Sequence, residues 1–331
     1  MIARRRLLGL LPAGLVAVAA PALARARRRI VMVTFRGDTD VERGFRDHLA
    51  ARGLDAELIH RDLGSDIANL PAVIDETRAL APDLIYTWGT PITLGTVGPW
   101  DAVDPSRRIT DIPVVFALVA APVGAKITRS LAGSGRNVTG AVHVVPVETQ
   151  MRAMRGYRDF GRFGTLYSAN EQNSVALVGE LHEWAAAAGV TLDARPFAQG
   201  SDGNSTDAGL DDLVRGLGRD GAEWLYYPPD TFLGQNYARV SAAALAARLP
   251  TFGAAELAIR EGGALAGIVS RYYSVGQLAG AKAHAILAEG ADPGTIPIET
   301  LNRFSLIINL AVAKELELYP PLAMLDYAEL I

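Results

Sequence analysis

Cysteine is absent from the 331 residues of the chain. This absence excludes disulfide bonds, thiolate metal sites, a cysteine nucleophile and the lipid-modified cysteine of bacterial lipoproteins. Histidine is scarce: the five residues include no pair at a metal-binding spacing, so we interpret them as surface or boundary residues and predict no metal site. Aromatic residues make up 7% of the chain and hydrophobic residues 50%, a composition that indicates a globular protein of helices packed on sheets.

The chain also lacks the motifs of common enzymes. It contains no G-x-x-x-x-G-K-[ST] phosphate loop, no G-x-G-x-x-G after the first expected strand, no G-x-S-x-G and no H-E-x-x-H. The formal net charge of −4 has the opposite sign to that of a nucleic-acid-binding surface. We therefore predict a protein that is not an enzyme, needs no cofactor and binds no nucleic acid.

The first 24 residues have the three parts of a secretory signal peptide. The basic residues Arg4 to Arg6 precede an apolar stretch from Leu7 to Ala20, and the small-residue site Ala22-Leu23-Ala24 follows. We expect cleavage after Ala24 and a soluble, periplasmic protein without a lipid anchor. The alternative is a signal retained as a membrane anchor. Twin-arginine and general secretory export are both compatible with the arginine run.

Hydrophobic strand patterns alternate with helical patterns along the rest of the chain, which is typical of βαβ units and parallel sheets. Two such series are separated by a glycine-rich passage at 133–140. Because 331 residues exceed one ordinary domain, the sequence predicts two α/β lobes. Ligands of open parallel sheets bind outside the carboxyl ends of the strands, so a cleft is expected between the lobes. Expected elements include strands 30–35, 84–88 and 114–118, and a helix over 174–188 that ends at Gly189.

Short motifs follow one another along the chain in a characteristic order. They include Gly89-Thr90-Pro91, Ile112-Pro113-Val114-Val115-Phe116, Pro122-Val123-Gly124-Ala125, Gly135-Arg136-Asn137-Val138-Thr139-Gly140, Asn170-Glu171-Gln172-Asn173-Ser174 and Leu306-Ile307-Ile308-Asn309-Leu310. This series closely resembles the ABC-transporter substrate-binding family whose best-known members take up tryptophan, tyrosine or phenylalanine. The resemblance covers nearly the whole chain after the signal peptide.

The resemblance implies a type I periplasmic-binding fold, in which two Rossmann-like lobes are joined by three hinge strands. Lobe 1 would comprise 28–145 plus 254–300, and lobe 2 would comprise 146–253 plus 301–331. It further implies the extracytoplasmic solute-binding component of an ABC import system, a monomer that closes on a small organic ligand, amino-acid-like or carboxylate, and delivers it to an ABC permease. The alternative is a periplasmic ligand sensor that feeds a signalling kinase.

Residues at the ends of expected strands are candidate ligand contacts, and the resemblance adds Ala121, Arg271, Tyr272 and Tyr273. Helix-opening amides at Gly89 and Thr90 suit an anion, although the same residues could simply cap the helix. Adjacent side chains of an extended segment point in opposite directions, so only one of Tyr272 and Tyr273 should face the ligand. The full set of candidates is Phe35, Arg36, Gly89, Thr90, Pro91, Ala121, Asn173, Ser174, Asp230, Arg271, Tyr272 and Tyr273.

Two of these positions depart from the resemblance. Ala121 and Arg271 stand where the family pattern leads us to expect aspartate. If an aspartate normally holds an amino group, its loss disfavours an ordinary amino acid, because a buried ammonium without its partner keeps its desolvation cost. Arg271 is predicted instead to clamp a ligand carboxylate. The alternative is that Arg271 points to solvent and pairs with a surface carboxylate.

Overall fold

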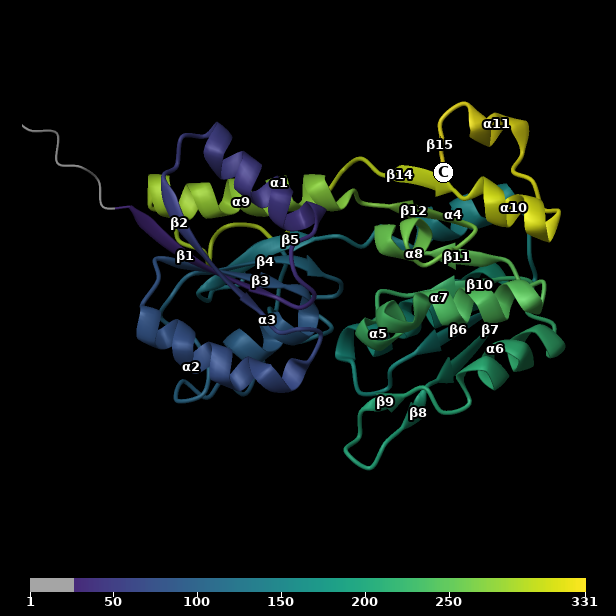
Figure 1. The fold of residues 1–331 in the computed structure, drawn as a ribbon, viewed down its shortest axis with the longest axis horizontal. Helices are drawn as coiled ribbons and strands as arrows, with labels where there is room; N and C mark the ends of the chain where they lie inside the picture. The colour runs from purple at the N-terminus through teal and green to yellow at the C-terminus, as the bar shows by residue number, and fades with distance from the viewer. Residues whose placement is uncertain (1–26) are drawn as a thin grey trace, which may run out of the picture.

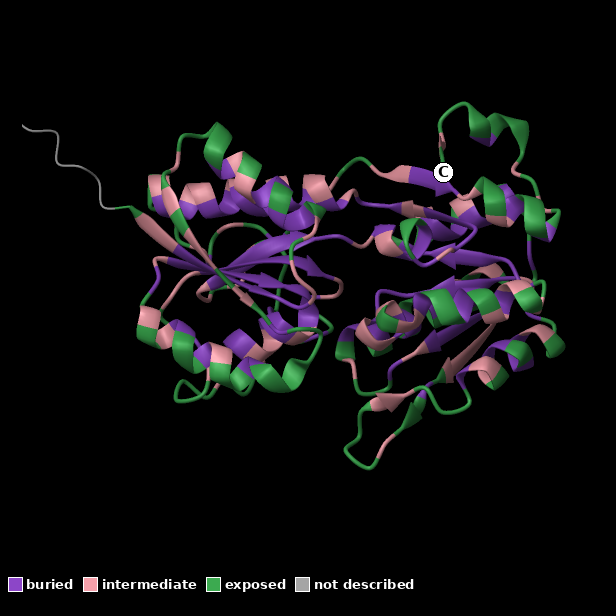
Figure 2. Cartoon of the chain, in the orientation of Figure 1, coloured by how far each residue is buried: buried purple, intermediate pink, exposed green. Residues whose placement is uncertain are grey.

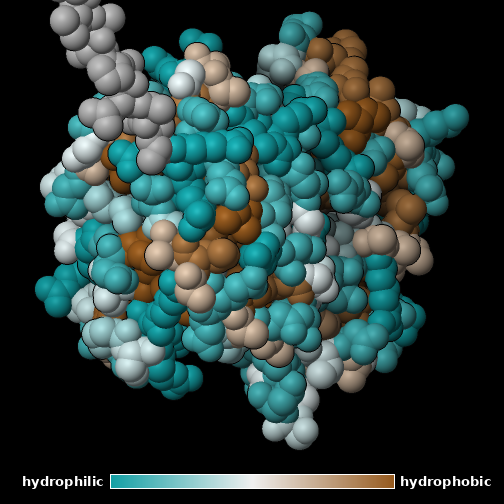
Figure 3. All heavy atoms as spheres, turned by 60° about the vertical axis from the view of Figure 1, so that its left-hand side comes forward, coloured by the Kyte–Doolittle hydropathy of each residue, from teal (hydrophilic) through white to brown (hydrophobic). Residues whose placement is uncertain are grey.

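The computed structural model describes residues 27–331, which form two α/β lobes lying side by side (Figure 1). The expected signal peptide lies outside these residues. Within 27–331, every helix is too short or too polar to cross a membrane. Polar side chains cover most of the face seen in Figure 3, and apolar ones reach it in patches.

The first lobe contains a six-stranded sheet in the order β13-β5-β4-β3-β1-β2, with every pairing parallel. Its strands are β1 (Arg28–Thr34), β2 (Ala56–Asp62), β3 (Leu84–Trp88), β4 (Val114–Val119), β5 (Val138–Val142) and β13 (Glu299–Thr300). Strands β3, β4 and β5 are buried along their whole length, as Figure 2 shows, because helices cover both faces of the sheet. The helices are α1 (Asp40–Ala51), α2 (Leu70–Leu80), α3 (Gly89–Val97) and α9 (Tyr272–Glu289).

The second lobe contains a seven-stranded sheet in the order β15-β14-β12-β11-β10-β6-β7. Its strands are β6 (Arg162–Tyr167), β7 (Thr191–Pro196), β10 (Leu225–Tyr227), β11 (Thr251–Gly253), β12 (Ala266–Val269), β14 (Ser305–Ile308) and β15 (Glu329–Leu330). Only β14 runs antiparallel to its neighbour β12 in this sheet. The helices are α4 (Val147–Tyr157), α5 (Gln172–Ala188), α6 (Leu210–Arg219), α7 (Thr231–Ala246), α8 (Glu256–Arg260), α10 (Leu310–Leu316) and α11 (Leu322–Leu325), and a hairpin of β8 (Ala198–Gln199) and β9 (Ser205–Thr206) projects from the lobe.

The chain crosses between the lobes after β5, after β12 and after β13. The second crossing differs from the expected lobe boundary at residue 254. Strand β12 pairs with β11 and β14 of the second sheet, so the chain stays in the second lobe until Val269 and returns at 270–271. The sequence-based boundary was therefore too early.

The lobes also contact each other directly. The Gln235 side chain on α7 donates a hydrogen bond from Nε2 to the Ser65 carbonyl of the first lobe at 3.1 Å. Arg36 lies against Gly234 of the same helix, where an added Cβ would be 3.3 Å from a terminal guanidinium nitrogen. The absence of a side chain at Gly234 therefore leaves room for Arg36 between the lobes.

Candidate ligand-binding cleft

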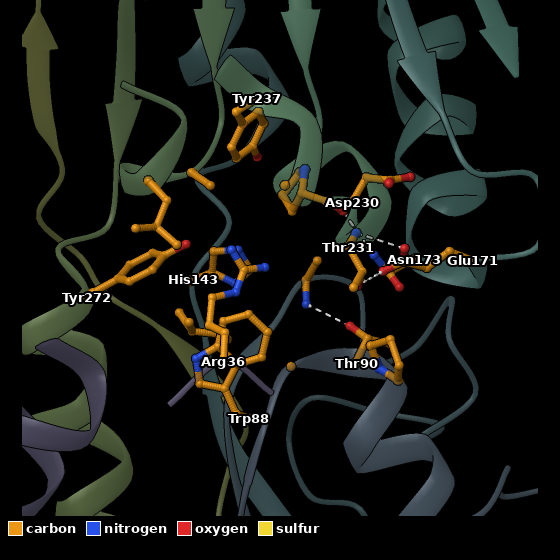
Figure 4. A pocket seen from close by; sticks show the side chains of 18 residues that line it. Arg36, Trp88, Thr90, His143, Glu171, Asn173, Asp230, Thr231, Tyr237 and Tyr272 are labelled. Atoms are coloured by element: carbon orange, nitrogen blue, oxygen red, sulfur yellow. Dashed lines mark hydrogen bonds between the residues drawn. The ribbon is translucent and has the colours of Figure 1, made fainter. Parts of the chain in front are cut away.

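A cavity lies between the two lobes, at the carboxyl ends of the parallel strands (Figure 4). The first lobe contributes residues that follow β1, β3, β4 and β5, and the second lobe contributes the segments that open α5, α7 and α8. The start of α9, directly after a crossing, completes the lining with Tyr272. This position outside the strand ends is the one predicted for the ligand of two open α/β sheets.

The wall formed by the first lobe contains the positively charged side chain of Arg36 and the N-terminus of helix α3. The guanidinium carbon of Arg36 lies 5.1 Å from the ring centroid of Trp88, in a cation–π contact. Gly89 has a φ of +77°, which lets the chain turn sharply from β3 into α3. The Thr90 hydroxyl in the first turn of α3 accepts a hydrogen bond from the Ala120 amide at 3.3 Å. This wall therefore suits an anionic ligand group.

The floor of the cleft consists of His143 and Tyr272, which come from two different crossings. Their rings are nearly perpendicular, with centroids 6.2 Å apart. Both side chains are buried, and burial lowers the pKa of His143 to about 4 and raises that of Tyr272. His143 is therefore neutral at ordinary pH.

The wall formed by the second lobe carries two carboxyl groups that also tie its loops together. Asp230 caps α7 by accepting from the Leu233 amide at 2.8 Å, and it accepts from the amide and hydroxyl of Ser168 at 2.7 and 3.0 Å. Glu171 accepts from the amide and hydroxyl of Thr231, both at 2.8 Å. Asn173 donates to the Pro229 carbonyl at 3.0 Å.

Burial makes these two carboxyl groups hard to ionise together. It raises the pKa of Asp230. Burial, followed by the charge of Asp230, raises the pKa of Glu171 to about 8, although the hydrogen bonds from Thr231 act in the opposite direction. A cation placed between these groups would favour their ionised forms. The second lobe thus offers a site for positive charge opposite the anion-binding wall of the first.

The sequence-based candidates divide into two groups. Those that line the cleft are Arg36, Gly89, Thr90, Pro91, Asn173, Asp230 and Tyr272. Phe35 does not line the cavity but stacks with Trp88, with ring centroids 6.0 Å apart. Ala120 lines the cleft, whereas its neighbour Ala121 does not. Ser174 is fully buried but does not line the cavity.

Of the adjacent tyrosines, Tyr272 lines the cleft and Tyr273 does not, and the reason is not the alternation of an extended segment. The pair opens α9 and is helical, so the two side chains diverge by the turn of a helix and not by the alternation of a strand. Tyr273 points toward α1 and donates to Asp47 at 3.0 Å.

Arg271 lies outside the cleft in a ring of alternating charges. It contacts Glu256 at 3.0 Å and Glu329 of the C-terminal strand, and Arg260 contacts the same two carboxylates at 2.8 and 2.6 Å. Arg271 also donates from Nε to the Ser305 hydroxyl at 2.9 Å. Burial alone would raise the pKa of Glu256, but hydrogen bonds from the Tyr272 amide and both arginines outweigh it and lower that pKa. These contacts match the alternative interpretation of Arg271, pairing with carboxylates, rather than a ligand clamp.

Replacing Arg271 should therefore weaken the fold more than ligand binding. Arg271→Ala removes the contacts that join α8, β14 and the C-terminal strand, and we expect a loss of about 1–2 kcal/mol in the free energy of unfolding, measured with urea. Arg215→Ala, which removes an exposed pair with Asp212, is the matched control and should leave stability unchanged. Unchanged stability together with a tenfold loss of ligand affinity would restore the clamp hypothesis.

The sequence-based prediction did not identify several residues that line the cleft. Trp88 ends an expected strand and Glu171 belongs to a quoted motif, so the strand-end rule could have indicated both. His143, interpreted as a surface or boundary residue, is in fact buried in the floor of the cleft. Thr231 and Tyr237 lie on α7, and their approach to the first lobe depends on how the lobes meet.

Two α/β lobes with parallel strands, three crossings and a cavity between them define the type I periplasmic-binding fold. The chain belongs to the ABC transporter substrate binding protein family, whose model matches residues 30–330. This confirms the resemblance found in the sequence, and the protein is a solute-binding component of an ABC transport system.

Individual relatives are distant. The tyrosine-binding protein of Clostridioides difficile is 24% identical over 278 residues, covering 84% of this chain and 74% of that protein. A conserved domain protein of Vibrio cholerae has a TM-score of 0.79 at 24% identity, covering 92% of this chain and 99% of that one. The ABC domain of Streptococcus pneumoniae in complex with L-Trp also has a TM-score of 0.79, at 22% identity, covering 92% of this chain and 100% of that one.

Proposed function

We propose that this protein captures a small amino-acid-like ligand in the periplasm, as a soluble monomer, and delivers it to an ABC permease. The ligand carboxylate contacts Arg36 and the N-terminus of α3, and its ammonium group lies against Glu171 and Asp230. The observation that carries the proposal is the opposite polarity of the two cleft walls. A dipolar ligand that bridges them stabilises the state in which the lobes are together.

The relatives support this ligand class. One is named for tyrosine and another was solved with L-Trp, and both of these ligands combine a carboxylate with an ammonium group. The loss of expected aspartates at Ala121 and Arg271 argues less strongly against an amino acid than the sequence indicated, because neither position lines the cleft. Glu171 and Asp230 supply the acidic groups instead.

The test is a thermal-shift screen of the protein against amino acids, aromatic acids and dicarboxylates, followed by calorimetry on the compounds that raise its melting temperature. We expect an amino acid to bind best, and X-ray scattering at saturation to show a smaller radius of gyration than without ligand. Preferential binding of a cation without a carboxylate, or scattering unchanged by a bound ligand, would contradict the proposal.

Amino-acid binding should also depend on pH. The pKa of Glu171 near 8 means that this group carries a proton at pH 6 in the free protein. A ligand ammonium favours the ionised carboxylate, so binding releases the proton and affinity rises by up to about tenfold per pH unit between pH 6 and 8. Calorimetry in buffers of different ionisation enthalpy measures the release. Glu171→Gln should abolish the pH dependence, and an equal slope in both proteins would show that another group is responsible.

A further inference from the structure

Buried polar atoms without a hydrogen-bond partner gather around the cleft. Among the described residues they include Arg36 Nε, Trp88 Nε1, His143 Nδ1 and Asn173 Oδ1, all on side chains that line the cavity. Native proteins rarely leave such atoms unpaired, so groups without partners in a binding cleft indicate the polarity of the ligand. The proposed function assigns a role to Arg36 but none to Trp88 or His143.

Trp88 can act only as a hydrogen-bond donor, because the indole has one N–H and no acceptor. Its ring is stacked with that of Phe35, with an interplanar angle of 16°, and the guanidinium of Arg36 also lies against it. The side chain is 9% exposed. Contacts with these two side chains hold the indole ring at the end of β3.

His143 provides the complementary acceptor. It is neutral, because burial lowers its pKa to about 4. A neutral imidazole has one N–H and one nitrogen that accepts, and the buried Nδ1 has no partner among the described residues. The perpendicular ring of Tyr272 packs beside it (Figure 4).

We propose that Trp88 and His143 are specificity-determining residues that select ligands carrying a hydroxyl group toward the floor of the cleft. A hydroxyl can accept from Trp88 and donate to His143, whereas a hydrogen or methyl in its place leaves both buried groups unpaired. The inference rests on the proposed function, because the hydroxyl belongs to the same amino-acid-like molecule whose carboxylate meets Arg36.

Two pairs of probes that differ by one hydroxyl test the proposal: L-tyrosine with L-phenylalanine, and L-serine with L-alanine. Calorimetry on the wild-type protein should show the hydroxyl-bearing member of the better-bound pair binding at least tenfold more tightly. Trp88→Phe keeps an aromatic ring but removes the N–H, and His143→Phe removes the acceptor. Either change should lower the affinity for the hydroxyl-bearing probe alone, so that the ratio of the two affinities within the pair falls toward one. His143→Gln keeps an acceptor and should retain part of the preference for the hydroxyl-bearing probe.

The outcomes separate the two proposals. Equal affinity within both pairs in the wild-type protein would overturn the roles of Trp88 and His143 and leave the proposed function standing. A wild-type preference for the hydroxyl that survives in Trp88→Phe and His143→Phe would place the selection elsewhere in the cleft. If none of the four probes binds although another amino acid does, this inference fails and the proposed function stands. If no amino acid binds, both fail.

Discussion

Arg36→Ala should reduce the affinity for an amino-acid ligand by about ten- to a hundredfold, because a hydrogen bond to a charged partner in a desolvated site contributes roughly 1.5–3 kcal/mol. Arg36 extends from the end of β1 across the cleft, and its buried Nε has no partner among the described residues. The change should leave the fold intact, since the side chain is only half-buried. Calorimetry with L-tyrosine would measure the loss.

Two controls isolate the contact with the carboxylate. Arg43→Ala removes a neighbouring arginine that pairs with Asp40 and does not line the cavity, so it should not change the affinity. Tyramine, which has the ammonium group but no carboxylate, should bind the wild-type protein and Arg36→Ala equally. If Arg36→Ala weakens tyramine as much as L-tyrosine, Arg36 acts by holding the lobes together and not by binding the carboxylate.

Much of the first lobe could be predicted because its strands carry strong local signals. Residues 84–88 form β3 as expected, and β4 ends at Val119, one residue beyond the expected end at 118. Both strands could be predicted because central parallel strands are continuous apolar runs. Gly189 ends α5 in a left-handed conformation, with a φ of 66°. Strand β12 has four residues, too few for a clear pattern, and its pairing with β14 depends on contacts distant in sequence. Because this strand was not predicted, the expected lobe boundary at residue 254 lies too early in the chain.

The site was harder to predict, because strand ends indicate a region and not the side chains that enter it. The two arginines illustrate the limit. Arg36 and Arg271 are both positioned near the cleft, but Glu256 and Glu329 bind Arg271 and hold it away. That competition involves the last strand of the chain, which no local pattern around residue 271 reveals. The neutral state of His143 likewise depends on burial by both lobes and the hinge.

The largest effect on stability is expected where α1 and α9 pack with their backbones in contact. A Cβ added at Gly276 would overlap the Val41 carbonyl, and one at Gly44 would overlap the Tyr273 carbonyl. Because these obstacles are backbone atoms, the helices would have to separate. Gly276→Ala should therefore lower the free energy of unfolding by about 3 kcal/mol or more, at or above the upper end of the usual cost of overpacking. Urea unfolding would measure the change.

Gly179→Ala on α5 is the matched control. Gly179 also lies within a helix, but a Cβ there meets nothing within 4 Å, so alanine should stabilise the protein by about 0.5–1 kcal/mol through its better helix propensity. Both substitutions replace glycine by alanine, but the expected changes in the free energy of unfolding have opposite signs. Since α9 begins at Tyr272, separating it from α1 should also move the floor of the cleft and weaken ligand binding in Gly276→Ala alone. Similar unfolding curves and affinities for the two variants would show that α1 and α9 are not in such close contact.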